Sequence, residues 1–326
     1  MRTRSDAIVG AFVGAAVGDA LGFATEFRSR AKILTAFGPE GVTDFVAQQD
    51  PRWTPPPHII GAHHPPGTYS DDTQMAIAVA EALLAEPGRD LDAVMAEMAR
   101  RFVAWSRSEE NNRAPGGTCM TGCGNLEAGV AWREAGVAGS KGCGSVMRVA
   151  PIALAFARQP AWMLELARAS SLATHGHPAA VEGCAATALA VAMALECTPP
   201  GALLDGIEKV TRGRSPDLDE AFDRLRGMQS LPPEEALTEG KLGEGWVAEE
   251  ALVSALYCFL RTPDDFRSTV LAATNTDGDS DSIACIAGAL SGAYNGLGAI
   301  PLSWREGVED APRLHELGEA LARLGG

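Results

Sequence analysis

The sequence predicts an all-α fold, and two observations support this prediction. The apolar runs have the length of helices, and the two-residue alternation typical of strands is absent. Hydrophobic residues make up 46% of the chain and aromatic residues only 6%, so small side chains such as Ala and Gly have to fill much of the interior. We therefore expect one domain, residues 1–326, built from about a dozen or more closely packed helices.

Composition and charge exclude several classes of partner. The net charge is −15, which argues against binding to nucleic acid or to an anionic membrane surface. A single phosphorylated ligand remains possible, because a bound metal ion can invert the local field. The seven cysteines form no CxxC pair and no zinc-ligand spacing, so we expect reduced thiols and a cytoplasmic location.

The N-terminal segment predicts a core helix. Arg2 and Arg4 followed by Ala7–Gly18 resemble a signal peptide, but Asp6 interrupts the pattern and the apolar run is only about 12 residues long. We therefore expect a buried helix over Ala7–Leu21. Glycines recur at every fourth position and share one face of this helix: Gly10, Gly14, Gly18 and Gly22. Such a face permits close packing of helices.

An acidic turn lies before the apolar run Ile283–Tyr294. Asp277, Asp279 and Asp281 alternate with Gly278 and hydroxyl residues, and this spacing does not place carboxylates on one face of a helix. We expect a loop that leads into a buried helix starting near Asp281 or Ser282, where converging carboxylates require a divalent cation between them. The alternative is a single N-cap with solvated acids beside it.

An EF-hand is excluded for this turn. Its sixth position, counted from Asp277, is Ser282 rather than Gly, and its twelfth is Gly288 rather than Glu.

The same pattern occurs about 200 residues earlier in the chain. Tyr69-Ser70-Asp71-Asp72-Thr73 precedes another apolar helix, expected over Met75–Leu84. Two such starts favour a shared metal site over capping alone. Four carboxylates, those of Asp71, Asp72, Asp279 and Asp281, can hold two cations.

Three further features are candidates for chemistry. Glu26 lies among apolar residues, where desolvation would raise its proton affinity and suit it to acid–base work, although a solvated Glu is the alternative. The glycine-rich segments Ala114–Thr118 and Gly139–Ser145 are expected to be turns, and free N–H groups of the second can hold a phosphate or ribose edge. His175 can contact a ligand or make a structural hydrogen bond.

The remaining chain is expected to be helices and loops. Helices are predicted over Leu91–Arg107, Leu164–Thr174, Ala179–Leu195, Trp246–Leu260 and Asp264–Ala273. Residues 46–67 are rich in Pro and His and predict a long loop, either a lid or a surface excursion. Residues 198–245 are less apolar and suit short helices with a variable loop. Glycines at 288, 292 and 296 repeat the pattern of the first helix and predict close backbone approach near the site.

Taken together, the motifs resemble those of the ADP-ribosylglycohydrolase family, which includes the enzyme that removes ADP-ribose from dinitrogen reductase. The resemblance rests on four motifs that occur in the family's order: Gly18–Gly22 with Glu26, Ser70–Thr73, Gly142–Arg148 and Gly278–Ser282. It implies an all-helical fold with two divalent cations, most often Mg²⁺ and sometimes Mn²⁺. It also implies hydrolysis of the glycosidic bond between ADP-ribose and an acceptor, on an ADP-ribosylated protein or a small ADP-ribose conjugate.

The resemblance also implies roles for individual residues. Glu26 falls at the position of the family's mobile glutamate, and with Asp279 it is the expected catalytic pair. Gly142, Gly144 and Ser145 fall in the loop that holds ribose and diphosphate, and His175 falls near a ligand-contacting histidine. The metal ligands of the family fall on six residues: Ser70, Asp71, Asp72, Asp279, Asp281 and Ser282.

The chain departs from the family's pattern at a few positions. Ser70 and Ser282 replace the commoner threonines and keep the oxygen ligand, whereas Cys143 stands at a usual asparagine position and puts one ligand hydrogen bond in doubt. Asp277 is an additional acid to which the sequence assigns no role. Two other functions remain open, a non-catalytic ADP-ribose-binding or structural protein and a metal-dependent nucleotide phosphohydrolase. The acceptor linkage (arginine, serine, O-acyl or another) is not specified by the sequence.

Overall fold

The computed structural model describes residues 2–53 and 64–325, and the regular structure of these residues is helical. Two isolated β-bridges add to it, one between Val137 and His175 and one between Gly142 and Val247. The first half of the chain forms α1 (Arg4–Phe23), α2 (Arg30–Phe37), α3 (Asp71–Ala85), α4 (Leu91–Ser106), α5 (Gly117–Glu127), α6 (Trp132–Ala135), the 3₁₀ helix η2 (Cys143–Ser145), α7 (Ala150–Phe156) and α8 (Pro160–Leu172). The second half forms α9 (Pro178–Leu195), α10 (Pro200–Thr211), α11 (Pro216–Met228), α12 (Pro233–Ala236), α13 (Ala248–Arg261), α14 (Phe266–Thr274), α15 (Ser280–Asn295), the 3₁₀ helix η3 (Leu297–Ala299), α16 (Leu302–Gly307) and α17 (Ala311–Leu324). The predicted all-α fold is confirmed.

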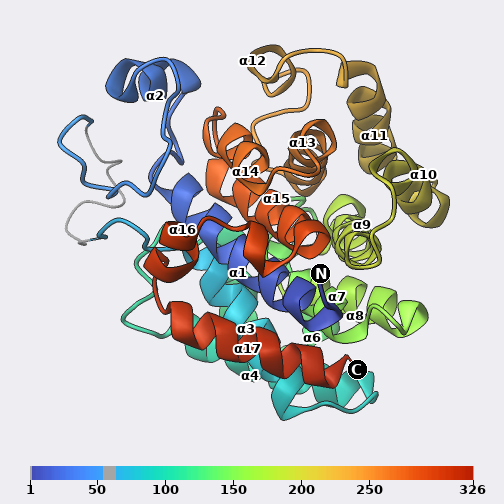
Figure 1. Ribbon diagram of the computed structural model, residues 1–326. Helices are drawn as coiled ribbons and strands as arrows, with labels where there is room; N and C mark the ends of the chain where they lie inside the picture. The colour runs from blue at the N-terminus through green and yellow to red at the C-terminus, as the bar shows by residue number, and fades with distance from the viewer. Residues whose placement is uncertain (1, 54–63, 326) are drawn as a thin grey trace.

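The helices α1 and α15 lie side by side near the centre of the molecule (Figure 1). They run antiparallel, and their glycines bring the two backbones together. A Cβ atom on Gly14 would lie 2.6 Å from the carbonyl oxygen of Gly288, and one on Gly18 would overlap the backbone of Ala284. The predicted close backbone approach at the glycine faces is therefore confirmed, and it extends to the last turn of α1 at Gly22.

The rest of the fold surrounds this pair. The helices α3, α7 and α17 contact α1, while α9, α13 and α14 contact α15. Every residue of α1 from Ala7 to Phe23 is buried, which agrees with the prediction of a core helix. By length and composition α1 and α9 could cross a membrane, and most of each lies buried in the molecule.

Observed helix starts differ from those predicted at the two places that matter most. The helix expected from Met75 begins at Asp71, and the one expected to start near Asp281 or Ser282 begins at Ser280. The acids therefore belong to first turns and N-caps, where free backbone N–H groups and the helix dipole favour negative charge. The helix α5 was not predicted, and it begins at Gly117, inside a segment that was expected to be a turn.

The two regions predicted to be irregular differ from each other. Residues 198–245 contain the short helices α10, α11 and α12, as expected. The described parts of the loop predicted over 46–67, residues 46–53 and 64–67, contain no helix, and residues 54–63 lie outside the described residues.

Candidate active site

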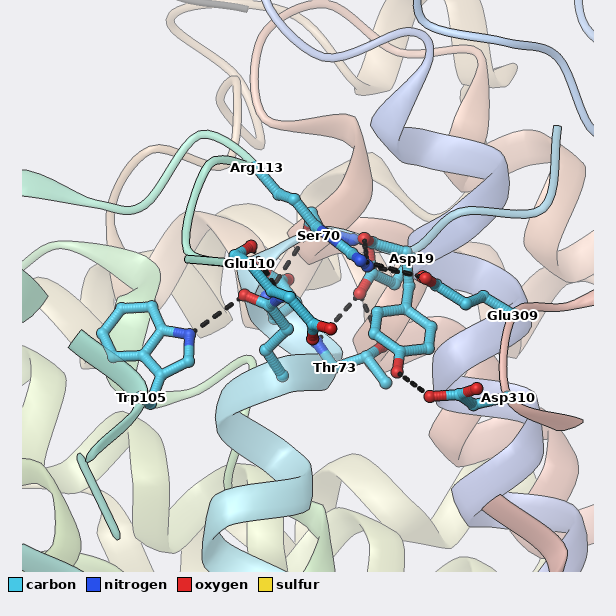
Figure 2. Close-up of polar contacts among 11 residues, drawn as sticks. Asp19, Ser70, Thr73, Trp105, Glu110, Arg113, Glu309 and Asp310 are labelled. Atoms are coloured by element: carbon cyan, nitrogen blue, oxygen red, sulfur yellow. Dashed lines mark hydrogen bonds and ion pairs between the residues drawn. The ribbon is translucent and has the colours of Figure 1, made fainter. Parts of the chain in front are cut away.

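The last turns of α1 bring the two acidic segments together. Asp19 is fully buried, and its carboxylate accepts hydrogen bonds from the backbone N–H of Ser70 (2.8 Å) and of Thr73 (2.9 Å) and from the Thr73 hydroxyl (2.5 Å). Figure 2 shows Asp19 facing these residues at the start of α3. About one helical turn further along α1, a Cβ atom on Gly22 would lie 2.6 Å from the backbone nitrogen of Asp281. One helix therefore positions both acidic helix starts.

Asp19 is a functional residue whose role sequence reasoning did not identify. Burial raises the pKa of Asp19 to about 6, and the hydrogen bonds from Thr73 and Ser70 oppose this rise. The available signal was a lone acid in an otherwise apolar helix, because a buried carboxylate requires hydrogen-bond donors.

The start of α15 is fixed by its own acid and by the Glu26 turn. Asp279 is the N-cap, and its Oδ1 accepts the backbone N–H of Ser282 at 3.3 Å. Thr25 and Ser280 share a hydrogen bond of 2.8 Å between their hydroxyls. The turn that carries Glu26 is thereby attached to the acidic turn, which places the Glu26 carboxyl beside the aspartates.

Glu26, Asp279 and Asp281 form a tight group of buried carboxyls. Each offers an oxygen atom, and these oxygens all lie within 4.8 Å of one another. Oε2 of Glu26 and Oδ1 of Asp281 have no hydrogen-bond partner among the described residues. Burial, followed by the charges of Asp281 and Asp279, raises the pKa of Glu26 well above its ordinary value. Burial and then Asp279 do the same to the pKa of Asp281.

The first acidic turn contributes two more buried carboxyls. Oδ2 of Asp71 accepts the backbone N–H of Gly116 at 3.4 Å, and the Ser70 hydroxyl accepts the backbone N–H of Asp72 at 3.3 Å. Oδ2 of Asp72 lacks a partner among the described residues. Burial raises the pKa of both acids, and the next largest cause is Asp19 for Asp71 and Asp281 for Asp72. Such a site accepts positive charge readily.

These acids line a cavity of about 880 Å³. Nine of the residues proposed from the sequence lie on its wall: Glu26, Asp71, Asp72, Gly142, Gly144, His175, Asp279, Asp281 and Ser282. Ser70 and Ser145 do not lie on it. Both are fully buried, and the Ser145 hydroxyl accepts a hydrogen bond of 3.1 Å from Ser171.

The glycine-rich wall of the cavity packs on His175. A Cβ atom on Gly144 would lie 3.0 Å from Cε1 of His175, and one on Gly142 would lie 3.2 Å from Nε2, so the absence of side chains keeps the ring close to the cavity. Burial and then the nearby Arg148 lower the pKa of His175 to about 3. The imidazole is therefore neutral at physiological pH, and its Nδ1 is hydrogen-bonded to the Thr174 hydroxyl at 2.8 Å.

Arg148 supports this wall from behind, and sequence reasoning placed it in the Gly142–Arg148 motif without giving it a role of its own. It is fully buried and donates to the carbonyl oxygen of Gly144 (2.9 Å) and to the Thr174 hydroxyl (2.6 Å), and its Cζ lies 4.5 Å from the centroid of the Phe102 ring. One guanidinium therefore connects the glycine loop with the residue that orients His175.

Two departures from the family's pattern acquire structural roles. The Cys143 thiol donates to Oδ2 of Asp279 at 2.9 Å, and its pKa is raised by burial and then by Asp279, so it remains a protonated donor. Oδ1 of Asp277 accepts the backbone N–H of Arg30 at 2.7 Å. Asp277 thus holds the start of α2 and does not line the cavity.

The loop before α5 forms a further wall and is anchored from a distance. Arg113 donates to the carbonyl oxygen of Tyr69 at 3.0 Å and forms a two-armed ion pair with Glu309, whose second arm measures 2.9 Å. Tyr69 in turn reaches Asp310 at 3.5 Å. Figure 2 shows this cluster beside Asp19 and Ser70. The segment before α17 therefore holds both the loop and the start of α3 in place.

Sequence reasoning also gave no role to seven further cavity residues: Phe27, Asn111, Asn112, Thr118, Cys119, Met147 and Trp246. Phe27 and Trp246 stack with ring centroids 5.2 Å apart and an interplanar angle of 29°. Their separation in the chain leaves no local signal of this contact.

Comparison with proteins of known sequence finds relatives that include ADP-ribosyl hydrolases. An ADP-ribosylhydrolase ARH3 from Homo sapiens is 29% identical over 315 residues, covering 82% of this chain and 84% of that protein. An ADP-ribosylarginine hydrolase Tri1 from Pseudomonas putida (strain GB-1) is 26% identical over 267 residues, covering 78% and 66%. An uncharacterised protein from Archaeoglobus fulgidus is 31% identical over 258 residues, covering 79% and 81%.

The fold and the whole sequence lead to the same group. A solved structure described as an ADP-ribosylglycohydrolase-related protein complex matches with a TM-score of 0.79 and 30% identity over 100% of both chains. The sequence model of the ADP-ribosylglycohydrolase family matches residues 1–326. With buried acids at two converging helix starts and a family match over its full length, the chain belongs to the ADP-ribosylglycohydrolase family.

Proposed function

We propose that this protein hydrolyses the glycosidic bond between ADP-ribose and an acceptor, which is a modified protein side chain or a small conjugate, and releases free ADP-ribose. The observation that carries the proposal is the group of buried carboxyls of Glu26, Asp279 and Asp281 on the wall of an 880 Å³ cavity. Family membership and the hydrolases among its relatives support it.

The donor atoms suit two hard divalent cations, Mg²⁺ first and Mn²⁺ second. Three buried acids, Glu26, Asp72 and Asp281, each leave a carboxylate oxygen without a partner among the described residues, and such oxygens are preferred ligands of these ions. We assign the ligands to six residues: Ser70, Asp71, Asp72, Asp279, Asp281 and Ser282. Bound cations would offset the carboxylate charge and provide positive charge for ribose hydroxyls and diphosphate.

In this proposal Glu26 moves the proton. A water oxygen bonds to the anomeric carbon, the bond from that carbon to the acceptor atom breaks, and the acceptor leaves with a proton. The raised pKa of Glu26 suits a group that exchanges protons near neutral pH. Asp279 lies beside it, and the surrounding carboxylates favour the positive charge that develops on the sugar in an oxocarbenium-like transition state.

The other wall residues bind and orient the substrate. The bare backbone at Gly142 and Gly144 allows close approach of ribose and diphosphate oxygens. The neutral His175 presents a ring nitrogen next to this loop without adding charge. Ser145 acts from behind the wall, through its contact with Ser171.

We further propose a cytoplasmic location for the protein. All seven cysteines are free in the structure, and five of them are buried. Reduced thiols of this kind are typical of cytosolic proteins.

The test is a panel of arginine-, serine- and O-acyl-linked ADP-ribose substrates, each incubated with Mg²⁺, with Mn²⁺ or with EDTA. We expect intact ADP-ribose as the product, by chromatography with mass detection, and no product in EDTA. Release of AMP or phosphate would identify a phosphohydrolase instead. Tight binding of ADP-ribose without turnover of any substrate would identify a binding protein.

A further inference from the structure

Two aromatic side chains stand exposed at the edge of the cavity. Phe27 is 40% exposed and Trp246 is 37% exposed, and they are two of the four large apolar side chains that are exposed in the described residues. Both line the cavity. Because exposed aromatic surface is costly in water, a stacked pair at a cavity edge indicates a binding surface.

The pair is held next to the reacting acids. The backbone N–H of Phe27 donates to the carbonyl oxygen of Gly278 at 3.0 Å. A Cβ atom on Gly278 would lie 3.0 Å from Nε1 of Trp246, so the indole also lies against this glycine. Phe27 follows Glu26 directly, and Gly278 precedes Asp279 directly. The two rings therefore meet beside the proposed reacting carboxyls.

Their position specifies which part of the substrate they contact. The bond to be broken has to lie within reach of Glu26 and Asp279, with the ribose on one side and the acceptor on the other. The first atoms of the acceptor are then within a side chain's length of Phe27 and Trp246. A residue at this place therefore contacts the acceptor and selects which acceptor the site binds.

The charge around the indole favours a cation. Nε1 of Trp246 donates to Oε2 of Glu244 at 3.0 Å, and a carboxylate at the ring edge makes the face of the ring more negative. Trp is the strongest aromatic partner for a cation, and the planar guanidinium of arginine stacks on such faces. A guanidinium lies over an indole at other places in the molecule, for example Arg28 over Trp53 and Arg133 over Trp132, each 4.0 Å from the ring centroid, and Nε1 of Trp132 likewise donates to a carboxylate, that of Asp92.

We infer, resting on the proposed hydrolase function, that the acceptor is an arginine side chain and that Trp246, with Phe27 beside it, holds its guanidinium. A serine or O-acyl acceptor offers no planar cation to this surface. The protein's net charge of −15 also favours a cationic acceptor.

The experiment compares kcat/KM for an arginine-linked and an O-acyl-linked ADP-ribose substrate in the wild type, Trp246→Ala and Trp246→Phe. We expect the ratio of arginine-linked to O-acyl-linked kcat/KM to fall about tenfold in Trp246→Ala, through a higher KM for the arginine-linked substrate, and to recover in part in Trp246→Phe. The control is Leu302→Ala, which removes another exposed apolar side chain outside the cavity and should leave the ratio and both rates unchanged.

Each alternative outcome has a separate meaning. A wild type that releases ADP-ribose from serine- or O-acyl-linked substrates and ignores the arginine-linked one would overturn the acceptor assignment and leave the hydrolase function standing. An equal fall in kcat for both substrates in Trp246→Ala would show that the ring pair only positions Glu26, which also overturns the inference. Failure of the wild type to release ADP-ribose from any substrate would overturn the proposed function itself.

Discussion

Glu26 occupies a place where an ionised carboxylate is unfavourable. It lies in a turn that is fixed by the Thr25 hydroxyl, which donates to the carbonyl oxygens of Gly22 and Thr274 at 2.8 Å each. Its carboxyl is buried against Asp279 and Asp281. The turn therefore forces together groups that repel, which is the usual condition for a tuned acid–base residue.

Exchanging Glu26 for glutamine should separate the proton-transfer role from metal binding. We expect Glu26→Gln to lower kcat by about 10²- to 10⁴-fold, because the amide cannot exchange the proton, while the Kd for Mg²⁺ measured by calorimetry stays at the wild-type value. Asp281→Ala is the matched contrast and should weaken Mg²⁺ binding as well as abolish turnover. Wild-type turnover in Glu26→Gln would contradict the assignment, and a loss of Mg²⁺ affinity in it would make Glu26 a ligand.

At this scale the sequence predicted which residues line the cavity better than it predicted their contacts. The alternating acids and their hydroxyl neighbours were sufficient to predict that Asp71 and Asp281 share a site. The role of Asp19 was not predicted, because a single acid in an apolar helix does not say which N–H groups it meets. Likewise the Cys143 thiol could be recognised as a departure from the family's pattern, but its bond to Asp279 depends on the position of a distant loop.

At the scale of elements, α1 and α15 work as one unit. Their closest contacts run along α1 from Gly10, which lies against Gly292, to Gly22, which lies against Asp281 in the first turn of α15. Every-fourth-residue glycines were enough to predict close backbone approach at each helix, because they form one face of a helix, but they did not specify that the two faces meet each other. The helix starts were predicted less well. The acids of first turns resemble loop residues in sequence, and only the capping geometry places them inside the helix.

A methyl group on Gly18 should push α1 and α15 apart. Its Cβ would overlap the Ala284 backbone, which cannot move without shifting α15, so we expect Gly18→Ala to lower the free energy of unfolding by about 3 kcal/mol. Urea denaturation measures the change, and Mg²⁺ affinity should fall with it. Gly124→Ala is the control: nothing lies within 4 Å of its Cβ in α5, so helix propensity should raise stability by about 0.5–1 kcal/mol. Equal stability of Gly18→Ala and the wild type would contradict the close packing.

For the whole molecule, the buried acids couple stability to pH and to cations. A carboxyl whose pKa is raised by folding binds more protons in the folded than in the unfolded state. It therefore does not destabilise the fold below its ordinary pKa, and its destabilising effect grows as the pH rises from the ordinary pKa through the folded value. For Asp19 this window runs from its ordinary 3.8 to about 6. For Glu26, Asp72 and Asp281 it extends higher, in the direction of their raised pKa values.

Stabilisation by Mg²⁺ should therefore grow with pH. We expect the difference between the melting temperatures in Mg²⁺ and in EDTA to increase from pH 5 to pH 8, and the stabilisation to reach about 2.7 kcal/mol when Mg²⁺ is at 100 times its Kd. Asp90→Asn, which changes an exposed helix cap outside the cavity, should show the same increase. A difference that does not change with pH would show that the buried acids do not bind the cation.

The parts of the site that the sequence did not predict are those assembled over long distances. The ion pair of Arg113 with Glu309 and the stack of Phe27 on Trp246 each join segments that carry no shared pattern. Neither residue type nor spacing marks these pairs, so proximity, which only the folded chain provides, gives them their roles. These surroundings of the cavity were unpredictable for this reason.

The pairing of α1 with α15 also has a consequence for biosynthesis. The Ser280 hydroxyl donates to the carbonyl oxygen of Gly22 across 258 residues of chain. At the usual speeds of translation, α1 is therefore synthesised on the order of 10 to 50 seconds before α15, against which it packs. During that interval the apolar surface of α1 has to be shielded by a chaperone or by temporary contacts, and the acidic site is complete only after α15 has been made.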